Sequence, residues 1–568
     1  MTTFQDPKQD ERFRELQKKE QEDLVVMLAE RHGFPHTRLS TATINTDALR
    51  LIPEAEARKA NVAPFALIGK RVKVGATSPT SPETLAIVDD LSRRGYEPEV
   101  VMISQTSIEH AWVLYPEISK AEETEAGVFD VSGRELVSLA QDIKGLSGIT
   151  DAVTAITDTS SSRNKISRVL EALLGGAVAV GASDIHFEPE ASGARVRMRI
   201  DGVLIDVSRL NGDMYRFLLS RIKLLSGLKL NITENSQDGR FSIRLPENAI
   251  EIRTSVIPEE HGESVVMRLL NPESLTIPFE ELGIDPYLFA ILKKEINRPD
   301  GLVLTTGPTG SGKTTTLYSF LKYIHTPEVK IITIENPIEY HLDGITQTQT
   351  NTKEGYTFVQ GLKTALRQDP DIIMVGEIRD SDTAQTALNA AFTGHLVFST
   401  LHTNNAAGVI PRLVNLGVNP KLITSGLNVS LAQRLTRRLC PTCKRPHVFD
   451  AEEQNIVERA IDRYNKKRGT DKSFAQGTFF DANTDTENTC PVCGGLGYKG
   501  RIGVYEGILT DEHIEAVILS DNLTEREIKK AAEAQNIPSM AEDGIAGKMY
   551  AGLTSFHELR RVVDVDET

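Results

Sequence analysis

One nine-residue run constrains the fold of this chain more than any other feature. The run GPTGSGKTT fits the pattern G-x-x-x-x-G-K-[ST], and it stands between an apolar strand-like run (302–306) and a helical segment (314–324). In that context, backbone N–H groups and a helix N-terminus surround phosphate oxygens. The sequence therefore predicts a phosphate-binding loop on an α/β sheet. The loop residues are Gly307, Pro308, Thr309, Gly310, Ser311, Gly312, Lys313, Thr314 and Thr315.

Two side chains of this loop carry the expected chemistry. We expect Lys313 to face solvent until phosphate arrives and then to neutralise the β- and γ-phosphates, while the Thr314 hydroxyl binds Mg²⁺. The glycines are expected because a Cβ would block the approach of phosphate to the backbone. The alternative is a glycine-rich turn with a solvated lysine, and the agreement of motif and context argues against it.

Short apolar runs, each followed by a turn and a helical pattern, continue beyond the loop. Buried parallel strands have this pattern, and it predicts strands at 302–306, 331–335, 371–375 and 396–400. Between the last two strands we expect a helix that Ser381 or Asp382 caps and that Gly394 ends. Glu377 and His395 then lie at opposite ends of one strand–helix–strand unit.

Five side chains near these strand ends are candidates for catalysis. We expect Glu377 to hold Mg²⁺ through water, and Glu335 or Glu339 to orient or deprotonate the attacking water. His395 and His402 flank the strand at 396–400. Each carboxylate could instead be a solvated group at a strand end, and each histidine an ordinary hydrogen-bonding residue.

Length and charge set further limits. At 568 residues the chain is too long for one core, and domains of about 150 residues suggest about four units. The net charge of −15 argues against a general nucleic-acid coat and against attachment to anionic lipid through bulk charge. No apolar run approaches the ~20 residues that cross a bilayer, and the amino terminus lacks a secretory signal, so we expect a cytoplasmic protein.

All four cysteines of the chain fall into two Cys-x-x-Cys pairs. Cys440 and Cys443 form CPTC, and Cys490 and Cys493 form CPVC, with residues 444–489 between the pairs. Two such turns supply four thiolates, which predicts a closed, structural Zn²⁺ site. The intervening segment is expected to be a surface excursion. Basic residues around the first pair suggest a contact surface, and they are Arg434, Arg437, Arg438, Lys444 and Arg445.

The pattern of composition and periodicity divides the chain. We expect a small amino-terminal α/β domain (1–120), an acidic, serine-rich linker (121–165) and a second domain with a mixed sheet (166–285). The domain with the phosphate loop (286–568) follows. It contains the zinc subdomain (436–505) and a carboxy-terminal helical part (506–568).

Four motifs together resemble a known family, the secretion ATPases of type II secretion and type IV pilus assembly. In order they are the phosphate loop, TIENPIEY, DIIMVGEIRD and TGHLVFSTLHTNNA, with further likeness at ASDIHFEP, RIDGVL and AQRLTRRLCPTC. The resemblance implies an α/β protein with a RecA-like core and a PAS-like second domain. It also implies a hexamer that hydrolyses ATP beneath an inner-membrane platform protein, at the inner face of the cytoplasmic membrane. By the same resemblance, residues 1–120 are a docking domain for a cytoplasmic or membrane adaptor, and residues 286–568 are the ATPase domain.

The resemblance assigns roles to residues. It makes Glu335 and Glu377 the main catalytic carboxylates and lets His395 and His402 sense the nucleotide or a neighbouring subunit. It also suggests that three arginines of the second domain reach the phosphates, namely Arg240, Arg253 and Arg268. Asn336 stands where the family usually has aspartate, so we expect slow turnover rather than none.

The family resemblance also suggests whether the motor extends or retracts a filament. Retraction motors of the family usually lack both the long amino-terminal domain and the cysteine pairs, so pilus extension or type II secretion is favoured. A zinc-containing nucleic-acid translocase is the competing hypothesis, and the net charge counts against it.

Overall fold

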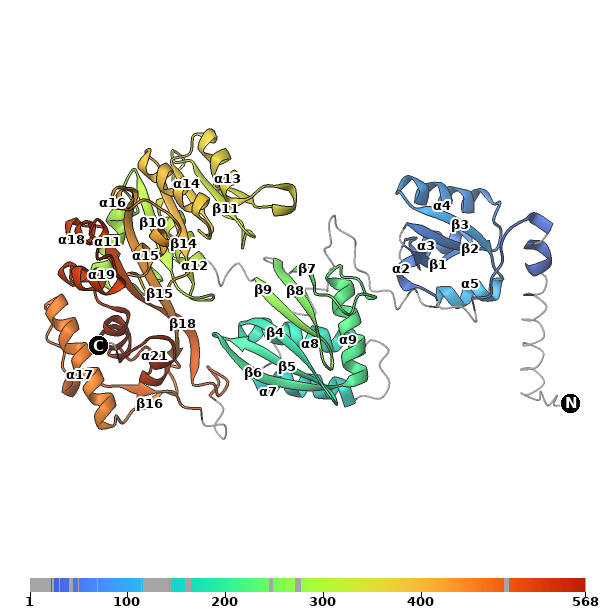
Figure 1. Ribbon diagram of the computed structural model, residues 1–568. Coiled ribbons are helices and arrows are strands. Elements are labelled where there is room, and N and C mark those ends of the chain that lie inside the picture. The colour runs from blue at the N-terminus through green and yellow to red at the C-terminus, as the bar shows by residue number, and fades with distance from the viewer. Residues whose placement is uncertain are drawn as a thin grey trace. The chain divides into compact units, whose positions relative to one another are not determined.

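The computed structural model describes most of the chain. The described residues are 25–29, 31–39, 44–49, 51–68, 70–113, 145–158, 165–244, 249–270, 277–484 and 490–566, together with 22, 115 and 143. Its contacts divide the chain into two compact units, Met1–Glu122 and Glu123–Thr568 (Figure 1). Each unit is described by itself. The acidic run that begins the expected linker lies outside the described residues.

The amino-terminal unit is a small α/β domain. Its sheet has the order β1-β2-β3, in which β1 (Val62–Ile68) pairs antiparallel with β2 (Arg71–Ala76), and β3 (Glu97–Met102) runs parallel to β2. Its helices include α2 (Thr46–Leu49), α3 (Glu54–Ala60), α4 (Pro82–Arg93) and α5 (Gln105–Trp112). The indole N–H of Trp112 donates to the carbonyl of Val62 at 3.1 Å and so ties α5 to the sheet.

The second part of the chain is built on a six-stranded sheet that is antiparallel throughout, so the mixed sheet expected from the sequence is wrong. The strand order is β6-β5-β4-β9-β8-β7. Side chains alternate along β5, with Val196 and Met198 buried and the arginines between them less so, because neighbouring residues of a strand face opposite sides. The elements are α7 (Gly145–Asp158), α8 (Lys165–Val180), β4 (Ala182–Glu190), β5 (Gly193–Ile200), β6 (Val203–Asn211), α9 (Gly212–Leu225), β7 (Gln237–Arg244), β8 (Ala249–Glu259) and β9 (Gly262–Leu270).

A seven-stranded sheet forms the core of the last part, with the order β12-β11-β13-β14-β10-β15-β18. The four strands expected from the sequence are confirmed as β10 (Gly301–Thr306), β11 (Ile331–Glu335), β13 (Ile372–Val375) and β14 (Leu396–Leu401), and they lie parallel. Every residue of these four strands is buried, which explains their largely apolar sequence. Only β18 (Tyr498–Leu509) runs antiparallel, against β15 (Leu427–Leu439).

Helices cover both faces of this sheet. They include α11 (Pro286–Glu295), α12 (Lys313–Ile324), α13 (Phe358–Ala365), α14 (Ser381–Phe392), α15 (Val409–Asn415) and α16 (Pro420–Gly426), and the short strand β12 (Thr346–Gln349) lies at one edge. The start of α14 differs from expectation. Asp380 caps it by accepting from Thr383 N at 2.8 Å, and Ser381 is the first helical residue. Gly394 follows the end of the helix at φ +99°, a conformation that favours glycine.

The segment between the cysteine pairs is more than the expected surface excursion. Its helix α17 (Ala451–Arg468) buries Ile456, Val457 and Ile461 in the main hydrophobic core. A two-stranded ribbon, β16 (Arg445–Pro446) with β17 (Phe480–Asp481), follows the first pair. The end of the acidic run, residues 485–489, lies outside the described residues.

The chain ends in short helices, and they are α18 (Glu512–Ile518), α19 (Glu525–Ala532), α20 (Met540–Glu542), the π-helix η7 (Asp543–Met549) and α21 (Phe556–Val562). Over the described ranges, none of the helices combines the length and the apolar character that spanning a bilayer requires.

Candidate active site

The carboxyl ends of the parallel strands bring the predicted residues together at one edge of the sheet. The phosphate loop follows β10, Glu377 follows β13, His402 follows β14, and Glu335 ends β11. Ligands of parallel α/β sheets bind at this edge. His395 precedes β14 and lies at the opposite edge, where its Nδ1 is 3.1 Å from the carbonyl oxygen of Ala390. The structure therefore does not bring His395 to the phosphate loop of its own chain.

Lys313 does not face solvent as expected. Its ammonium group donates to the carbonyl oxygens of Gly307 and Pro308 at 2.9 and 3.0 Å, so it closes the loop on itself. Burial lowers the pKa of Lys313 to about 8, and the charge of Glu377 partly opposes this shift. A phosphate would have to replace the two carbonyls as the partner of this ammonium.

The sequence analysis missed the strand that lies behind the loop. A Cβ on Gly307, which has φ +145°, would lie 2.6 Å from the carbonyl oxygen of Gln433 in β15. Glycine is thus required here by the approach of a strand, and not only by the approach of phosphate. The Gln433 amide also donates to the Ser311 carbonyl oxygen at 2.6 Å. The motif AQRL contains this glutamine, but its sequence distance from the loop hides the contact.

Glu377 lies in a small charged group. Its side chain is 15% exposed, and its two oxygens lie 2.5 Å from the Arg379 guanidinium and 3.6 Å from His402 Nε2. Two of the separately proposed candidates, Glu377 and His402, therefore come together in the structure. Arg379 belongs to the GEIRD run, although the sequence analysis gave it no role.

Glu335 is enclosed rather than open to water. Its side chain is buried and accepts hydrogen bonds from three groups: the Tyr318 hydroxyl, the Thr333 hydroxyl at 2.5 Å and the Gln347 amide at 3.1 Å. Burial raises the pKa of this carboxyl group, and the hydrogen bonds from Thr333, Tyr318 and Gln347 oppose the shift. Tyr318 lies on α12, so the network joins Glu335 to the helix that starts at the phosphate loop.

Glu339 pairs with the second domain. Its Oε2 lies 3.1 Å from the guanidinium of Arg253, which also donates to the carbonyl oxygen of Ile338 at 2.7 Å. The unusual Asn336 is exposed.

The three candidate arginines form a row across neighbouring strands. Arg240 lies opposite Arg253, and Arg253 lies opposite Arg268, on β7, β8 and β9. Arg268 donates to Asp184 on β4 at 2.9 Å. Like charges in directly opposite positions repel each other, so this row favours an anion beside it. Sequence spacing alone could not give this register.

The four cysteines form one cluster. The Cys440 and Cys490 sulfurs lie 3.8 Å apart, and those of Cys443 and Cys493 lie 3.6 Å apart. Zinc with four Zn–S bonds of about 2.3 Å separates its sulfurs by about 3.8 Å, so the residues fit this ion. Hydrogen bonds from the Cys493 and Val492 backbone lower the pKa of Cys490 to about 7.

The basic residues around the first pair are not a free patch. Arg437 pairs with the buried Glu558 at 2.8 Å, and Lys444 donates to the Gly552 carbonyl oxygen at 2.9 Å. Arg434 donates to the Asn404 carbonyl oxygen at 2.6 Å. Of the set, Arg438 and Arg445 are exposed and the other three are half-buried, so the local patch has two fully exposed cations, and its contact with a partner stays a prediction.

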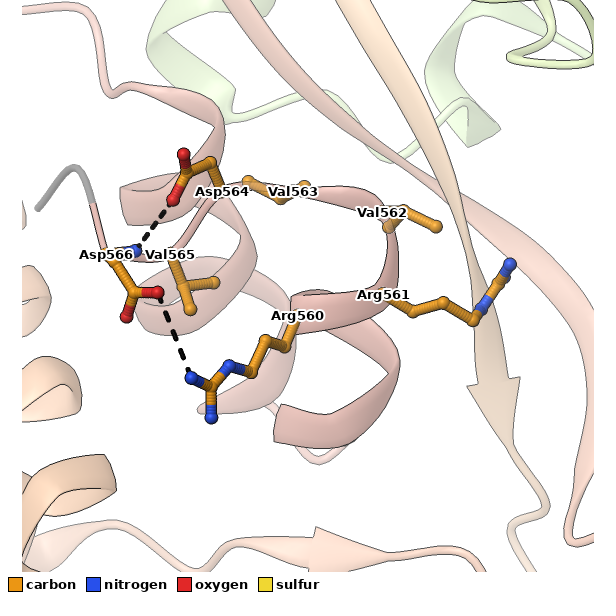
Figure 2. A pocket seen from close by; sticks show the side chains of 7 residues that line it. All are labelled: Arg560, Arg561, Val562, Val563, Asp564, Val565 and Asp566. Carbon is orange, nitrogen blue, oxygen red and sulfur yellow. Dashed lines mark hydrogen bonds and ion pairs between the residues drawn. The ribbon is translucent and has the colours of Figure 1, made fainter.

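A shallow hollow near the carboxy terminus is not the candidate site. Figure 2 shows the seven residues that line it, 560–566. Among them, the Arg560 guanidinium lies 3.9 Å from a carboxylate oxygen of Asp566, and the Asp566 N–H donates to the Asp564 carboxylate. No phosphate-loop residue lines it.

A phosphate loop after a buried parallel strand, with a carboxylate after a neighbouring strand, defines a P-loop ATPase. The family described as type II/IV secretion system protein matches residues 159–561, and the chain belongs to it. The protein is therefore an ATPase, and ATP is its nucleotide. Residues 32–121 match the domain described as MshEN. The recognition made from the four motifs is confirmed.

The curated relatives are named as ATPases of two systems, type II secretion and type IV pilus assembly. The type II secretion system ATPase E of Vibrio cholerae is 42% identical over 397 residues, or 70% of this chain and 75% of that protein. The type IV pilus assembly ATPase PilB of Myxococcus xanthus is 36% identical over 543 residues, or 95% of this chain and 91% of that protein.

Solved structures give weaker likenesses. The pilus retraction motor PilT with bound ADP is 27% identical, with 70% of this chain and 97% of that chain covered and a TM-score of 0.45. The ATPase DotB of Legionella pneumophila is 21% identical, with 71% and 96% covered and a TM-score of 0.48.

Proposed function

We propose that this protein is a hexameric motor that hydrolyses ATP to drive assembly of a type IV pilus or a type II secretion pseudopilus. The single observation that carries the proposal is the similarity to a pilus assembly ATPase over 95% of this chain, including the amino-terminal part. The work would be done at the inner face of the cytoplasmic membrane, against an inner-membrane platform protein. The amino-terminal domain would serve as the docking domain, ahead of the linker, second domain and ATPase domain at the expected boundaries.

The residues at the sheet edge have distinct roles in this proposal. Lys313 and the loop amides bind the phosphates, and the Thr314 hydroxyl and Glu377 hold Mg²⁺, which neutralises charge on the phosphates. Glu377 also orients the attacking water, with His402 beside it. Glu335 acts from its buried network by fixing α12 relative to β11, and it reaches water only if that network opens.

The arginine row supplies positive charge from the second domain. Arg253 holds Glu339 of its own chain, and Arg240 is exposed and free to approach phosphates. His395, at the far edge of the sheet, would act toward a neighbouring subunit of the hexamer.

Zinc belongs to the proposal as a structural ion. The sulfur separations support one Zn²⁺ held by Cys440, Cys443, Cys490 and Cys493. A closed set of four ligands leaves no position for substrate, so we assign it no catalytic step.

The test is an ATPase assay joined to a mass measurement in solution. We expect a hexamer in the presence of a non-hydrolysable ATP analogue, and a rise in ATPase rate when the cytoplasmic domain of a platform protein is added. Arg240→Ala should lower the rate, whereas Arg209→Ala, which only loses a surface pair with Glu190, should not. A monomer under all nucleotide conditions would refute the motor proposal.

Fluorescence anisotropy addresses the competing function. A motor of this kind should bind neither single- nor double-stranded DNA at moderate salt. Tight binding that weakens steeply with salt would instead favour the nucleic-acid translocase.

A further inference from the structure

A second group of metal-binding side chains lies beside the ribbon β16–β17. His447 follows β16, Asp481 ends β17, and His557 is in the first turn of α21. One ligand atom from each of these residues lies within 4.8 Å of the others. The group shares no residue with the four cysteines. Two imidazoles and one carboxylate from three separate elements thus converge on one point.

The distances fit an ion better than they fit hydrogen bonds. Nδ1 of His447 and Nδ1 of His557 lie 3.5 Å and 3.4 Å from the same oxygen, Oδ2 of Asp481. An N–H···O hydrogen bond places these atoms about 2.7–3.2 Å apart. Ligand atoms that surround zinc tetrahedrally, with bonds of about 2.0–2.1 Å, are separated by about 3.3 Å. Both observed pairs have that wider separation.

Neighbouring groups position Asp481 and His447 for the same metal site. The other oxygen of Asp481 accepts from the Ala482 N–H at 2.9 Å, which leaves Oδ2 for the histidines. The side chain of His447 is only 9% exposed, and its Nε2 is buried without a hydrogen-bond partner. This nitrogen lies 3.4 Å from a carboxylate oxygen of Glu453. The separation is beyond the roughly 2.7–3.2 Å of a hydrogen bond, but Glu453 is the carboxylate in place to accept this N–H when Nδ1 binds an ion, a support that metal-binding histidines commonly have.

We propose that His447, Asp481 and His557 bind a Zn²⁺ ion, with the fourth position open to water. Imidazole and carboxylate ligands suit zinc, and three protein ligands with one open position form a common zinc geometry. The side chain of His557 is 62% exposed, so solvent reaches the site. The ion joins the ribbon between the cysteine pairs to the carboxy-terminal helix α21. The chain would then bind two zinc ions with different affinities.

The test is a count of zinc sites on the full chain. Protein that already holds one equivalent of Zn²⁺ is titrated with more Zn²⁺ by calorimetry, and we expect one further site in the wild type. His557→Ala and Asp481→Asn should remove that site and leave the first. His513→Ala is the matched control, because His513 is an exposed histidine on α18 outside the group, and it should keep both sites.

Glu453→Gln tests the support of His447. Glutamine keeps the capping box that Glu453 forms with Asp450 at the start of α17, but it removes the carboxylate charge. We expect zinc binding at the second site to weaken by about 10- to 100-fold. Unchanged affinity would remove Glu453 from the proposal.

Cobalt distinguishes the two sites directly. Co²⁺ added after one equivalent of Zn²⁺ should give a spectrum without a thiolate charge-transfer band, and His557→Ala should abolish it. A single zinc site in the wild type, a second site that survives both His557→Ala and Asp481→Asn, or a thiolate band would each overturn the proposal. If circular dichroism showed that Asp481→Asn does not fold, the result would rest on His557→Ala, which changes an exposed residue.

Discussion

The phosphate loop and the cysteine cluster are both short turns beside β15, but they are supported differently. The loop lies between a fully buried strand, β10, and the helix α12, whose residues Leu317, Phe320 and Leu321 pack in a large core. Among the described residues, the cysteine cluster has Val492 packed against it, and the neighbouring small cluster contains only Leu439, Ala482 and Tyr498 as buried residues. The first turn can therefore form without a ligand, whereas the second needs its ion. A binding site can be shaped by its scaffold or by what it binds, and this chain contains both kinds.

The largest effect should come from Lys313→Ala. The change removes the ammonium that pairs with the phosphates, so ATP hydrolysis should fall by at least about 10²–10³-fold, while the melting temperature stays close to that of the wild type. Steady-state ATPase assays measure the hydrolysis rate, and thermal denaturation measures the melting temperature. A normal hydrolysis rate would mean that the loop does not bind the phosphates, and unfolding would mean that its scaffold is not self-sufficient.

Glu377→Gln should separate binding from turnover. It keeps the shape of the side chain but loses the charge that helps to order Mg²⁺ and water, so ATP should still bind while hydrolysis slows by about 10²-fold. A fluorescent ATP analogue measures binding, and single-turnover assays measure hydrolysis. Lost binding with normal residual turnover would reverse the roles given to Glu377 and Lys313.

Cys443→Ser tests whether the cysteine cluster needs its ion to fold. Four thiolates on zinc supply about 10–16 kcal/mol of apparent binding energy, which here supports local folding. We expect the zinc content to fall by one ion per chain and hydrogen exchange to rise around residues 439–444 and 490–498. Helix α17 and the phosphate loop should stay protected because their residues pack in the main core. A variant that loses ATP binding as fully as Lys313→Ala would contradict this separation.

The smallest effect concerns pH. The pKa of Lys313 is lowered to about 8 in the free protein, and bound phosphate favours its charged form. The protonated fraction falls above pH 8, so ATP affinity should drop by up to tenfold per pH unit there and stay constant below about pH 7. Calorimetric titrations between pH 7 and 9.5 measure this slope. Lys313→Arg, whose charge does not titrate in this range, should lose the slope if the lysine causes it.

The sequence predicted the parts of the site that depend on local pattern. The phosphate loop, the four parallel strands and the cysteine pairs each carry a recognisable motif or an apolar run within a few residues. The position of Glu377 followed directly from the strand before it. Helix α17 was also predictable, because Ile456, Val457, Ala460, Ile461 and Tyr464 recur at helical spacing, but its charged composition hid them.

The parts that were missed depend on contacts between distant residues. The hydrogen bond from Gln433 to Ser311, the enclosure of Glu335 by Tyr318 and the alignment of the arginine row all follow from strand pairing and packing. A single sequence does not contain the register of a sheet. The Lys313 contact was missed for a different reason: it is local, with the carbonyl oxygens of Gly307 and Pro308, and the motif describes only the partner that this lysine has when phosphate is bound.

β15 connects the two turns covalently. Gln433 contacts the phosphate loop, and Cys440 follows the end of the strand, seven residues or about 23 Å further along. Over this stretch the strand pairs with β18 as far as Leu439, whereas its pairing with β10 ends at Ala432. If the stretch tilts as one rigid element, movement at the nucleotide end is passed to the cysteine end. A tilt of about 10° at the loop would carry the cysteine end through about 4 Å, a displacement of the size that domain rearrangements use.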